Sequence, residues 1–400
     1  MRYARALVMA LLAIGGAAGA GCKDKEPEKA APQTAETKTS AAPASDTIVI
    51  GHVGSMTGNE ATFGQSSDNG MKLAVEEQNK KNGIKGKKIV LKTYDDQGKP
   101  EEAAVAATRL VTQDKVLTFL GEVSSSRSIA MGPVADSNKI PMISNSSTNP
   151  KVTKDGDKTR PFVFRVCFID PFQGTVMAKF AAENKKWKKV AILRDVGNDY
   201  SVGLANFFTE TFKKLGGDIV DDVSYKAGDQ DFKAQLTKLK SKGAEAFYVP
   251  GYYTDVALIA RQAKELGIKV PLMGGDGWDS EKLYEISKGA LDGSFFSNHY
   301  SPEDTSPQVK DFIAKYKATY NSVPDAHAVL GYDAANVAFH AMETAKELTG
   351  PAIREEVEKT KDFPGVSGKI TLNKDHNADK PAVVIGIEKN APKYAATISP

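Results

Sequence analysis

The sequence predicts an α/β protein of two Rossmann-like lobes, each built on a mostly parallel sheet flanked by helices. Short apolar runs alternate with amphipathic helical segments along most of the chain, which is typical of parallel sheets with helical crossovers. The alternation begins near residue 46 and is repeated from about residue 170. A length of 400 residues exceeds one typical domain, and 41% hydrophobic with 26% charged residues is an ordinary globular composition.

The first copy of the pattern covers residues 46 to about 169. Strands are expected at residues 47–53, 88–94, 116–121 and 140–144 because each is a short apolar run. The helix after Gly64 carries Met71, Ala74 and Val75 on one face, and further helices are expected at 100–114 and 126–138. Pro100 fits the first turn of its helix, where a backbone N–H is not needed.

The second copy begins near Asp170. Strands are expected at 189–194, 219–225, 246–250, 270–274 and 295–300, and helices at 172–184, 232–242 and 255–266. The intervening helix has one wide apolar stripe, formed by Leu204, Phe207, Phe208, Thr211, Phe212 and Leu215. The remaining chain predicts helices at 308–320, 326–348 and 353–360 and late strands at 368–372 and 382–388.

The N-terminus has the pattern of a targeting segment. Arg2 and Arg5 precede an apolar stretch and a run of small residues that ends at Cys22. This pattern resembles the bacterial lipobox, so we expect a lipoprotein-type signal peptide at 1–21 and a lipidated Cys22, with a plain secretory leader as the alternative. Residues 23–45 lack large apolar side chains and are expected to form a disordered tether to a membrane. Cys167 would then be a buried thiol without a disulfide partner.

Two clusters of hydroxyl side chains follow neighbouring predicted strands. The first is Ser124–Ser126, and the second runs from Ser144 to Thr148. If these strands are parallel, both clusters lie at the same edge of the sheet, where open α/β sheets bind their ligands. Hydroxyl groups together with amides at a helix start can hold a small anion such as a carboxylate. The alternative is that these residues are ordinary turn and helix-capping residues.

Signatures of catalysis, metal binding and nucleic-acid binding do not stand out. The sequence has no Gly-x-Ser-x-Gly elbow, phosphate-binding loop, zinc-protease helix or Cys-x-x-Cys pair. The five histidines have no metal-ligand spacing and are expected to be structural or solvated. The net charge is only +3, from 53 basic and 50 acidic residues, without a basic stripe. We therefore expect no catalytic residues, no metal, no cofactor and no nucleic-acid partner.

The loop Gly-Gly-Asp-Gly-Trp-Asp-Ser contains Asp276 beside Trp278. In a partly dry site this carboxylate can pair with an ammonium group, although a turn aspartate is the alternative, and Asp279 is the better candidate to cap the next helix. Phe63, Tyr200 and Tyr252, with Tyr253 and Trp278, follow predicted strands and suit the apolar walls of a small-molecule pocket.

From residue 46 onward the chain resembles the periplasmic Leu/Ile/Val-binding proteins, the receptors of branched-chain amino acid ABC transporters, which have the type I periplasmic-binding fold. The resemblance covers most of the mature chain. Its motifs, in order, are IVIGHVGSMTGNEATFG, NGIKGKKIVLKTYDDQ, LGEVSSS, ISNSSTNP, FRVCFIDPFQG, NDYSVGLA, VPGYY and LMGGDGWDS. It implies three hinge crossings between lobe one, at 46–169 plus 298–386, and lobe two, at 170–297 plus 387–400.

The resemblance also implies a set of ligand-binding residues. The first lobe would contribute a serine, a three-residue run and an aromatic at the mouth, namely Ser125, Ser146, Ser147, Thr148 and Phe63. The second lobe would contribute Asp170, Tyr200, Tyr252, Asp276, Gly277 and Trp278. Several positions depart from the family pattern: Ser146 and Ser147 replace alanines, Asp276 replaces a glutamate, and Gln97 and Ser124 occupy the positions of a disulfide.

The expected function is capture of an α-amino acid between the lobes and its delivery to the permease and ATPase of an ABC importer. A branched-chain or aliphatic amino acid is the first expectation, and the receptor is expected to be a monomer anchored outside the cytoplasm. A receptor of the same fold for an amide, urea or other small polar solute remains an alternative, as does a sensing lipoprotein without transport. A hydrolase using Ser125 or Ser126 is a third alternative, for which the sequence places no base.

Overall fold

The computed structural model describes residues 46–399. The predicted signal peptide, the lipidated Cys22 and the tether lie outside these residues.

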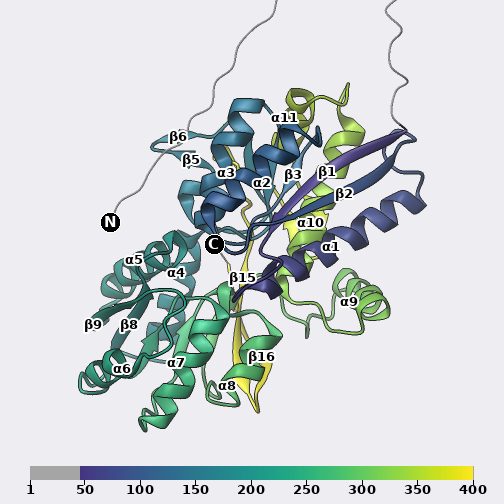
Figure 1. Ribbon diagram of the computed structural model, residues 1–400. Helices are drawn as coiled ribbons and strands as arrows, with labels where there is room; N and C mark the ends of the chain where they lie inside the picture. Colours follow the sequence, from purple (N-terminus) through teal and green to yellow (C-terminus); the bar gives the residue numbers. More distant parts are fainter. Residues whose placement is uncertain (1–45, 400) are drawn as a thin grey trace, which may run out of the picture. The chain divides into compact units, whose positions relative to one another are not determined.

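The first sheet has five parallel strands in the order β2–β1–β3–β4–β7. These strands are β1 (Thr47–Gly54), β2 (Lys88–Asp95), β3 (Phe119–Leu120), β4 (Met142–Ser144) and β7 (Val163–Arg165). Successive side chains of a strand face opposite sides, and β1 illustrates the result. Ile48 and Ile50 pack with α1 (Ala61–Lys80) and α10 (Ala326–Thr344), whereas Val53 packs with α2 (Pro100–Thr112) and α3 (Ser125–Asn138). Helices therefore cover both faces of this sheet (Figure 1).

Two more helices extend the layer formed by α1 and α10. Helix α11 (Gly350–Glu358) adds Ile353 and Val357 to the core shared by these helices. Helix α9 (Pro307–Tyr320) packs Val309 and Phe312 against Leu73 of α1.

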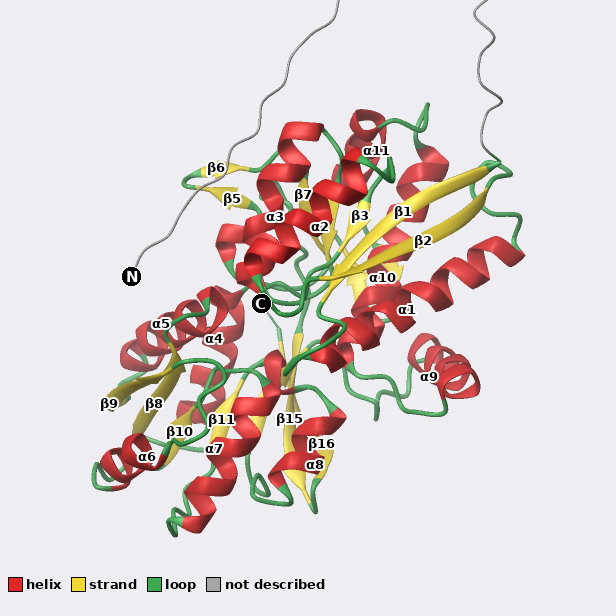
Figure 2. Ribbon diagram, viewed as in Figure 1, coloured by secondary structure: helices red, strands yellow, loops and turns green. Residues whose placement is uncertain are grey.

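The second sheet has seven strands in the order β16–β15–β12–β11–β10–β8–β9. Five are mutually parallel: β8 (Lys189–Asp195), β9 (Asp218–Tyr225), β10 (Ala246–Tyr248), β11 (Leu272–Gly274) and β12 (Phe295–Asn298). At one edge, β15 (Ala382–Glu388) and β16 (Ala391–Ile398) are antiparallel. The helices of this unit (Figure 2) are α4 (Asp170–Lys179), which continues as a π-helical segment η2 (Phe180–Asn184), α5 (Asp199–Lys214), α6 (Lys233–Lys240), α7 (Tyr253–Glu265) and α8 (Glu281–Ser287).

The predicted stripe of α5 is confirmed. Leu204, Phe208 and Phe212 are buried in the core of the second sheet, while Phe207 and Leu215 at the margins of the stripe are half-buried. A helix with one wide apolar face packs in this way against a sheet.

The chain passes between the two sheets three times. It leaves the first sheet after β7, returns after β12 and enters the second sheet again at β15. The expected boundary between residues 386 and 387 falls inside β15, whose pairing with β12 includes Val383.

The sequence does not indicate β16, because most of its side chains are exposed and no apolar alternation marks it. It also gives no sign of the small hairpin formed by β5 (Lys154–Asp155) with β6 (Lys158–Thr159). The strand expected at 368–372 appears as the short β14 (Gly368–Ile370), which pairs with the unpredicted β13 (Phe363–Gly365) and buries Ile370.

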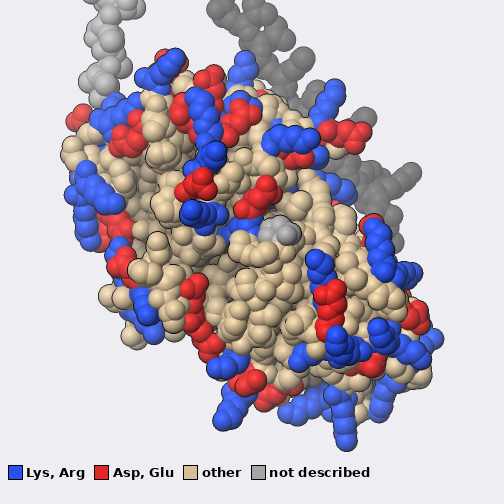
Figure 3. Space-filling model, turned by 180° about the vertical axis from the view of Figure 1, so that it is seen from behind, with Lys and Arg blue, Asp and Glu red and all other residues tan. Residues whose placement is uncertain are grey.

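The surface carries mixed charge. On the face shown in Figure 3, lysine and arginine side chains are interspersed with aspartate and glutamate, without a large area of one sign. No helix within residues 46–399 has the length and apolar character required to cross a membrane.

Candidate ligand-binding site

The two hydroxyl clusters lie at the same edge of the first sheet, as predicted. Strands β3 and β4 are parallel neighbours, with Phe119 paired to Met142 and Leu120 to Ile143. The first cluster begins α3, and the second follows β4. Ser125, Ser146 and Thr148 are all buried. The first amides of α3 have no acceptor within their own helix, so this edge offers both N–H and O–H donors.

Part of each cluster holds the two loops together. The Ser147 hydroxyl lies 2.7 Å from the carbonyl oxygen of Glu122, and the Ser147 amide donates to Ser144 Oγ at 3.0 Å. Ser125 Oγ accepts a hydrogen bond of 3.1 Å from the Asn149 amide. Ser147 was expected to contact the ligand through the resemblance, but its hydroxyl is used within the loop framework.

Two other hydroxyls of the second cluster are available. Ser146 Oγ and Thr148 Oγ1 are buried and make no hydrogen bond of normal geometry among residues 46–399, although the Thr148 hydroxyl lies close enough to the Asp170 carboxylate to lower its pKa. Most buried polar atoms in proteins have partners, and such an unpaired atom often marks a functional site. The loop itself is well anchored, because Arg165 Nη1 donates to the Ser147 carbonyl at 2.6 Å.

Asp170 faces this loop from the start of α4. Its amide donates to the Thr148 carbonyl at 2.9 Å, yet neither carboxylate oxygen has a hydrogen-bond partner of normal geometry in the described chain. Burial raises the pKa of Asp170 well above its usual range, and the neighbouring charge of Asp276 raises it further. The Thr148 hydroxyl and, less strongly, the charge of Arg165 act in the opposite direction but do not compensate.

Asp276 lies in the short η3 helix (Asp276–Trp278) after β11 and is 3% exposed. Its two carboxylate oxygens lie 2.7 Å from Gln173 Nε2 and 2.9 Å from His299 Nε2. Burial alone would raise its pKa, but the hydrogen bond and the charge of His299 hold the pKa below its usual value. The environments therefore separate the two acids: the pKa of Asp276 is held below its usual value and that of Asp170 above it, so Asp276 is the stronger acid and the anion of the pair.

His299 was not predicted as a site residue. It follows β12 directly, and its ring stacks on Phe168 with centroids 3.8 Å apart. His327 in the first turn of α10 is another residue that the sequence does not single out, and its ring centroid lies 4.4 Å from that of Phe63. The sequence led us to expect structural or solvated histidines. It could not show that His299 lies beside Asp276 and His327 beside Phe63, because these partners are distant along the chain.

An aromatic group adjoins the acids. Tyr200 and Tyr252 are stacked at a centroid distance of 5.3 Å, and Phe63 meets Tyr252 edge-on at 5.3 Å. The Gly277 amide donates to the Tyr200 hydroxyl at 3.2 Å. A Cβ at Gly277 would lie 2.8 Å from Tyr252 Cδ1, so only glycine lets these rings approach the backbone.

Trp278 does not join this group. Its indole N–H donates to the Val249 carbonyl at 3.0 Å, and its ring lies 6.0 Å from that of Phe296 in the core of the second sheet. A Cβ at Gly274 would approach the indole to 2.1 Å. Trp278 thus fills a space left by that glycine, which the sequence does not reveal. Asp279 is not the cap of α8, a role taken by Ser280, whose side chain accepts from the Lys282 amide.

Several hydrogen bonds join the loops of the first sheet to those of the second. Thr62 Oγ1 and Ser280 Oγ lie 2.9 Å apart, and Thr254 Oγ1 donates to the Asn59 carbonyl at 2.6 Å. Asp199 accepts a hydrogen bond of 3.0 Å from Ser126 Oγ. The site residues are therefore enclosed between the loops.

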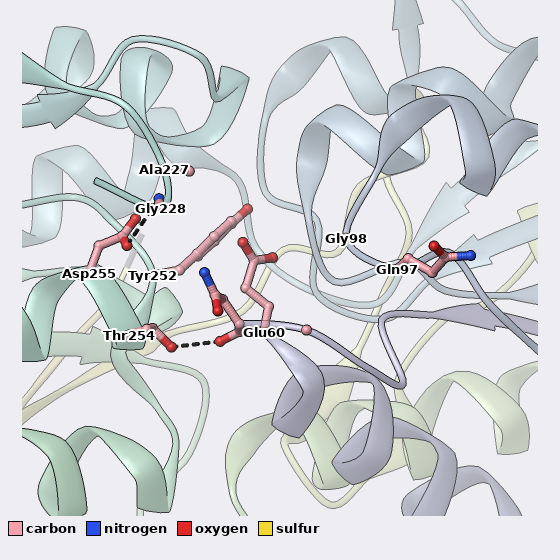
Figure 4. Close-up of a pocket in the computed structure, with 10 residues that line it drawn as sticks. Glu60, Gln97, Gly98, Ala227, Gly228, Tyr252, Thr254 and Asp255 are labelled. Carbon is pink, nitrogen blue, oxygen red and sulfur yellow. Dashed lines mark hydrogen bonds between the residues drawn. The ribbon is translucent and has the colours of Figure 1, made fainter. Parts of the chain in front are cut away.

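A pocket of about 330 Å³ opens beside Tyr252 and is lined by loops that follow β1, β2, β9 and β10. Figure 4 shows Tyr252 between the carboxylates of Asp255 and Glu60. Burial raises the pKa of Asp255 to about 7. Nearby, the Arg127 guanidinium lies 2.7 Å from Glu60 and 2.9 Å from Glu122, so this cation forms ion pairs with two acids at the mouth of the site.

Residues 46–399 contain no group of three or more metal-ligating side chains close enough to hold an ion. Their chemistry is that of recognition: hydroxyls and amides suited to a carboxylate, an anionic Asp276 suited to a cation, and aromatic rings suited to an apolar surface.

Residues 47–392 match the family model described as periplasmic binding protein. The chain belongs to this family. The resemblance inferred from its motifs is thereby confirmed, and the α/β architecture of this periplasmic binding protein agrees with it.

Curated relatives and solved structures of the periplasmic binding protein cover most of its length. The Leu/Ile/Val-binding protein homolog 3 of Brucella melitensis is 33% identical over 336 residues, which is 84% of this chain and 89% of the relative. A leucine-binding protein from Thermotoga maritima has a TM-score of 0.84 and 41% identity, covering 88% of this chain and 99% of that one. A branched-chain amino acid transporter substrate-binding protein from Streptococcus pneumoniae, solved with isoleucine, has a TM-score of 0.84 and 35% identity, covering 88% and 100%.

Proposed function

We propose that this periplasmic binding protein captures an α-amino acid between its two sheets and delivers it to the permease of an ABC importer. Branched-chain amino acids are the first candidates, because the relatives from Brucella melitensis and Streptococcus pneumoniae are named for them. In this proposal the chain binds its ligand without chemical change and is not an enzyme.

The observation that carries the proposal is a set of unpaired polar atoms facing an anionic carboxylate across one enclosed region. Among residues 46–399, Ser146 Oγ has no partner, Thr148 Oγ1 and the Asp170 carboxylate have none of normal geometry besides their proximity to each other, and Asp276 is the nearby anion. An α-amino acid carries both the acceptor and the cation that such a set lacks.

We assign the two ends of the ligand accordingly. The α-carboxylate would accept from the Ser125 and Thr148 hydroxyls and from the free amides at the start of α3. The α-ammonium would donate to Asp276 and to Ser146 Oγ. Closure of one lobe over a ligand already bound to the other would complete these contacts.

The cellular setting is also part of the proposal. A lipidated Cys22 would hold the receptor at a membrane outside the cytoplasm, and residues 23–45 would let the folded part reach a permease. A monomer is sufficient for this role, since every residue of the proposed site comes from one chain.

Binding of the twenty common amino acids to the purified protein tests the function. The protein is first unfolded and refolded to remove any ligand carried through purification, and affinities are then measured by isothermal titration calorimetry. Binding of at least one α-amino acid, with loss of binding when its α-amino group is removed, is expected. Absence of binding to all twenty would refute the proposal, and equal binding of the deaminated analogue would favour a receptor for another small solute.

A further inference from the structure

His327 is a buried polar residue that the contacts assigned above do not use. It is 0% exposed, and neither ring nitrogen has a hydrogen-bond partner within residues 46–399. A neutral imidazole carries one N–H donor and one acceptor nitrogen. Both are therefore withdrawn from water without compensation, which costs free energy that an apolar side chain of similar size would not incur.

The ring of His327 remains neutral at physiological pH. Burial lowers its pKa to about 4, while the nearby Asp276 acts in the opposite direction and His299 lowers it further. Neither of these neighbours hydrogen-bonds to His327, and the oxygens of Asp276 lie within hydrogen-bond distance of Gln173 and His299 instead. His327 is thus positioned as a neutral donor and acceptor rather than as a charge.

His327 adjoins the aromatic rings of the site. Its ring centroid lies 4.4 Å from that of Phe63, and the Tyr252 ring meets the same Phe63 ring edge-on at a centroid distance of 5.3 Å. The Tyr252 hydroxyl lies near the side chains of Ser124 and Asn198, whereas both ring nitrogens of His327 are unpaired among residues 46–399. His327 is therefore an unpaired polar group beside Phe63, which we expect to contact the ligand.

A wall selected only for aliphatic side chains would not place an unpaired histidine beside Phe63. We propose that His327 hydrogen-bonds a polar group on the ligand's side chain, so that the receptor prefers α-amino acids with a small hydroxyl or carboxamide side chain over aliphatic isosteres. This inference rests on the proposed capture of an α-amino acid and departs from the branched-chain candidates named above. A binding site with buried polar groups discriminates strongly against an apolar analogue, because that analogue leaves the polar groups without hydrogen bonds.

Isosteric ligand pairs test the preference. Threonine and valine have nearly the same shape, as do asparagine and leucine, but only one member of each pair can hydrogen-bond. With the refolded protein we expect threonine or asparagine to bind more tightly than its partner, by about tenfold or more. Valine and leucine binding more tightly than threonine and asparagine would overturn the inference while leaving amino-acid binding intact.

Variants identify the residue responsible. His327→Phe is expected to abolish or invert the preference within each pair and to leave glycine and alanine affinities nearly unchanged. His327→Gln keeps a donor and an acceptor and should retain part of the preference. His340→Phe, on the exposed side of the same helix, serves as the control, and thermal unfolding verifies that each variant is folded. Equal weakening of glycine and threonine by His327→Phe would show that His327 contacts the part common to all amino acids, and would refute its role in selectivity.

If the refolded protein binds no α-amino acid at all, the proposed function and this inference both fail. If it binds amino acids but shows no preference within either pair, only the inference fails. The two failures are therefore distinguishable in one set of titrations.

Discussion

Replacement of Asp276 by asparagine removes one charge and leaves the shape of the side chain almost unchanged. The carboxylate is 3% exposed, and its two oxygens lie 2.7 Å from Gln173 Nε2 and 2.9 Å from His299 Nε2. It remains the anion of the site because His299 holds its pKa below the usual range. In Asp276→Asn a bound ammonium would lose its buried counter-charge.

The expected loss is that of one partner of a buried ion pair, about 3–5 kcal/mol. At about 1.4 kcal/mol per factor of ten, this weakens binding by roughly 150-fold to 5,000-fold. Calorimetry on the refolded protein measures the change with the amino acid that binds the unaltered protein most tightly. Because the new amide group presents N–H donors to Gln173 or His299, a small loss of thermal stability is expected as well.

Asp292→Asn provides the matched control, since that carboxylate is on the exposed surface and accepts from the Asn390 amide. It should bind amino acids as the unaltered protein does. An Asp276→Asn variant that is folded and keeps its affinity would show that the carboxylate is a turn residue stabilising its own loop. The assignment of the ammonium to Asp276 would then be wrong.

Two further predictions separate binding from stability. Ser146→Ala should weaken amino-acid binding about tenfold with little change in the free energy of unfolding. Ser147→Ala should lower the free energy of unfolding by about 1–2 kcal/mol, because of these two serines only Ser147 forms hydrogen bonds within the loop framework. Urea unfolding and calorimetry on both variants test this difference, and equal effects of the two substitutions would contradict it. The pKa of Asp255 is raised by burial to about 7 from 3.8, so the folded state binds its proton more tightly than the unfolded state. Its contribution to stability is fully present below about pH 4 and is lost as the pH rises through about 7, at up to roughly 1.4 kcal/mol per pH unit. Urea unfolding of Asp255→Asn between pH 4 and pH 8 should show a shallower decline than the unaltered protein, and identical slopes would exclude this source of pH dependence.

The sequence predicts which loops form the site better than it predicts which side chains line it. Ser125 and Thr148 follow strands that are neighbours along the chain, so one βα unit is enough to bring them to the same edge. His299 and His327 approach Asp276 and Phe63 only after both sheets and α10 are assembled. No local pattern marks such residues, because their partners are distant in the sequence.

Trp278 illustrates a different limit of the sequence. Its place in a glycine-rich loop after a strand favours a pocket wall, yet the indole turns into the core beside Gly274. The direction of a side chain depends on the space left by its neighbours, and one missing Cβ decides it here. The fold class survives such errors because it depends on the alternation of strands and helices rather than on single side chains.

Asp199 gives the enclosed arrangement a property that matters for delivery. Its side chain accepts from Ser126 Oγ at 3.0 Å and from Lys151 Nζ at 2.9 Å, and its carbonyl accepts from Asn149 Nδ2 at 2.8 Å. The lysine side chain is 70% exposed and the aspartate side chain 35%, so this contact is screened by salt and weak. A receptor whose lobes were joined firmly without ligand would admit ligand only in a rare open state, and one joined firmly with ligand would release it slowly. Because this exposed ion pair adds little to the hydrogen bonds that join the loops, the residence time of the ligand depends more on the ligand's own contacts.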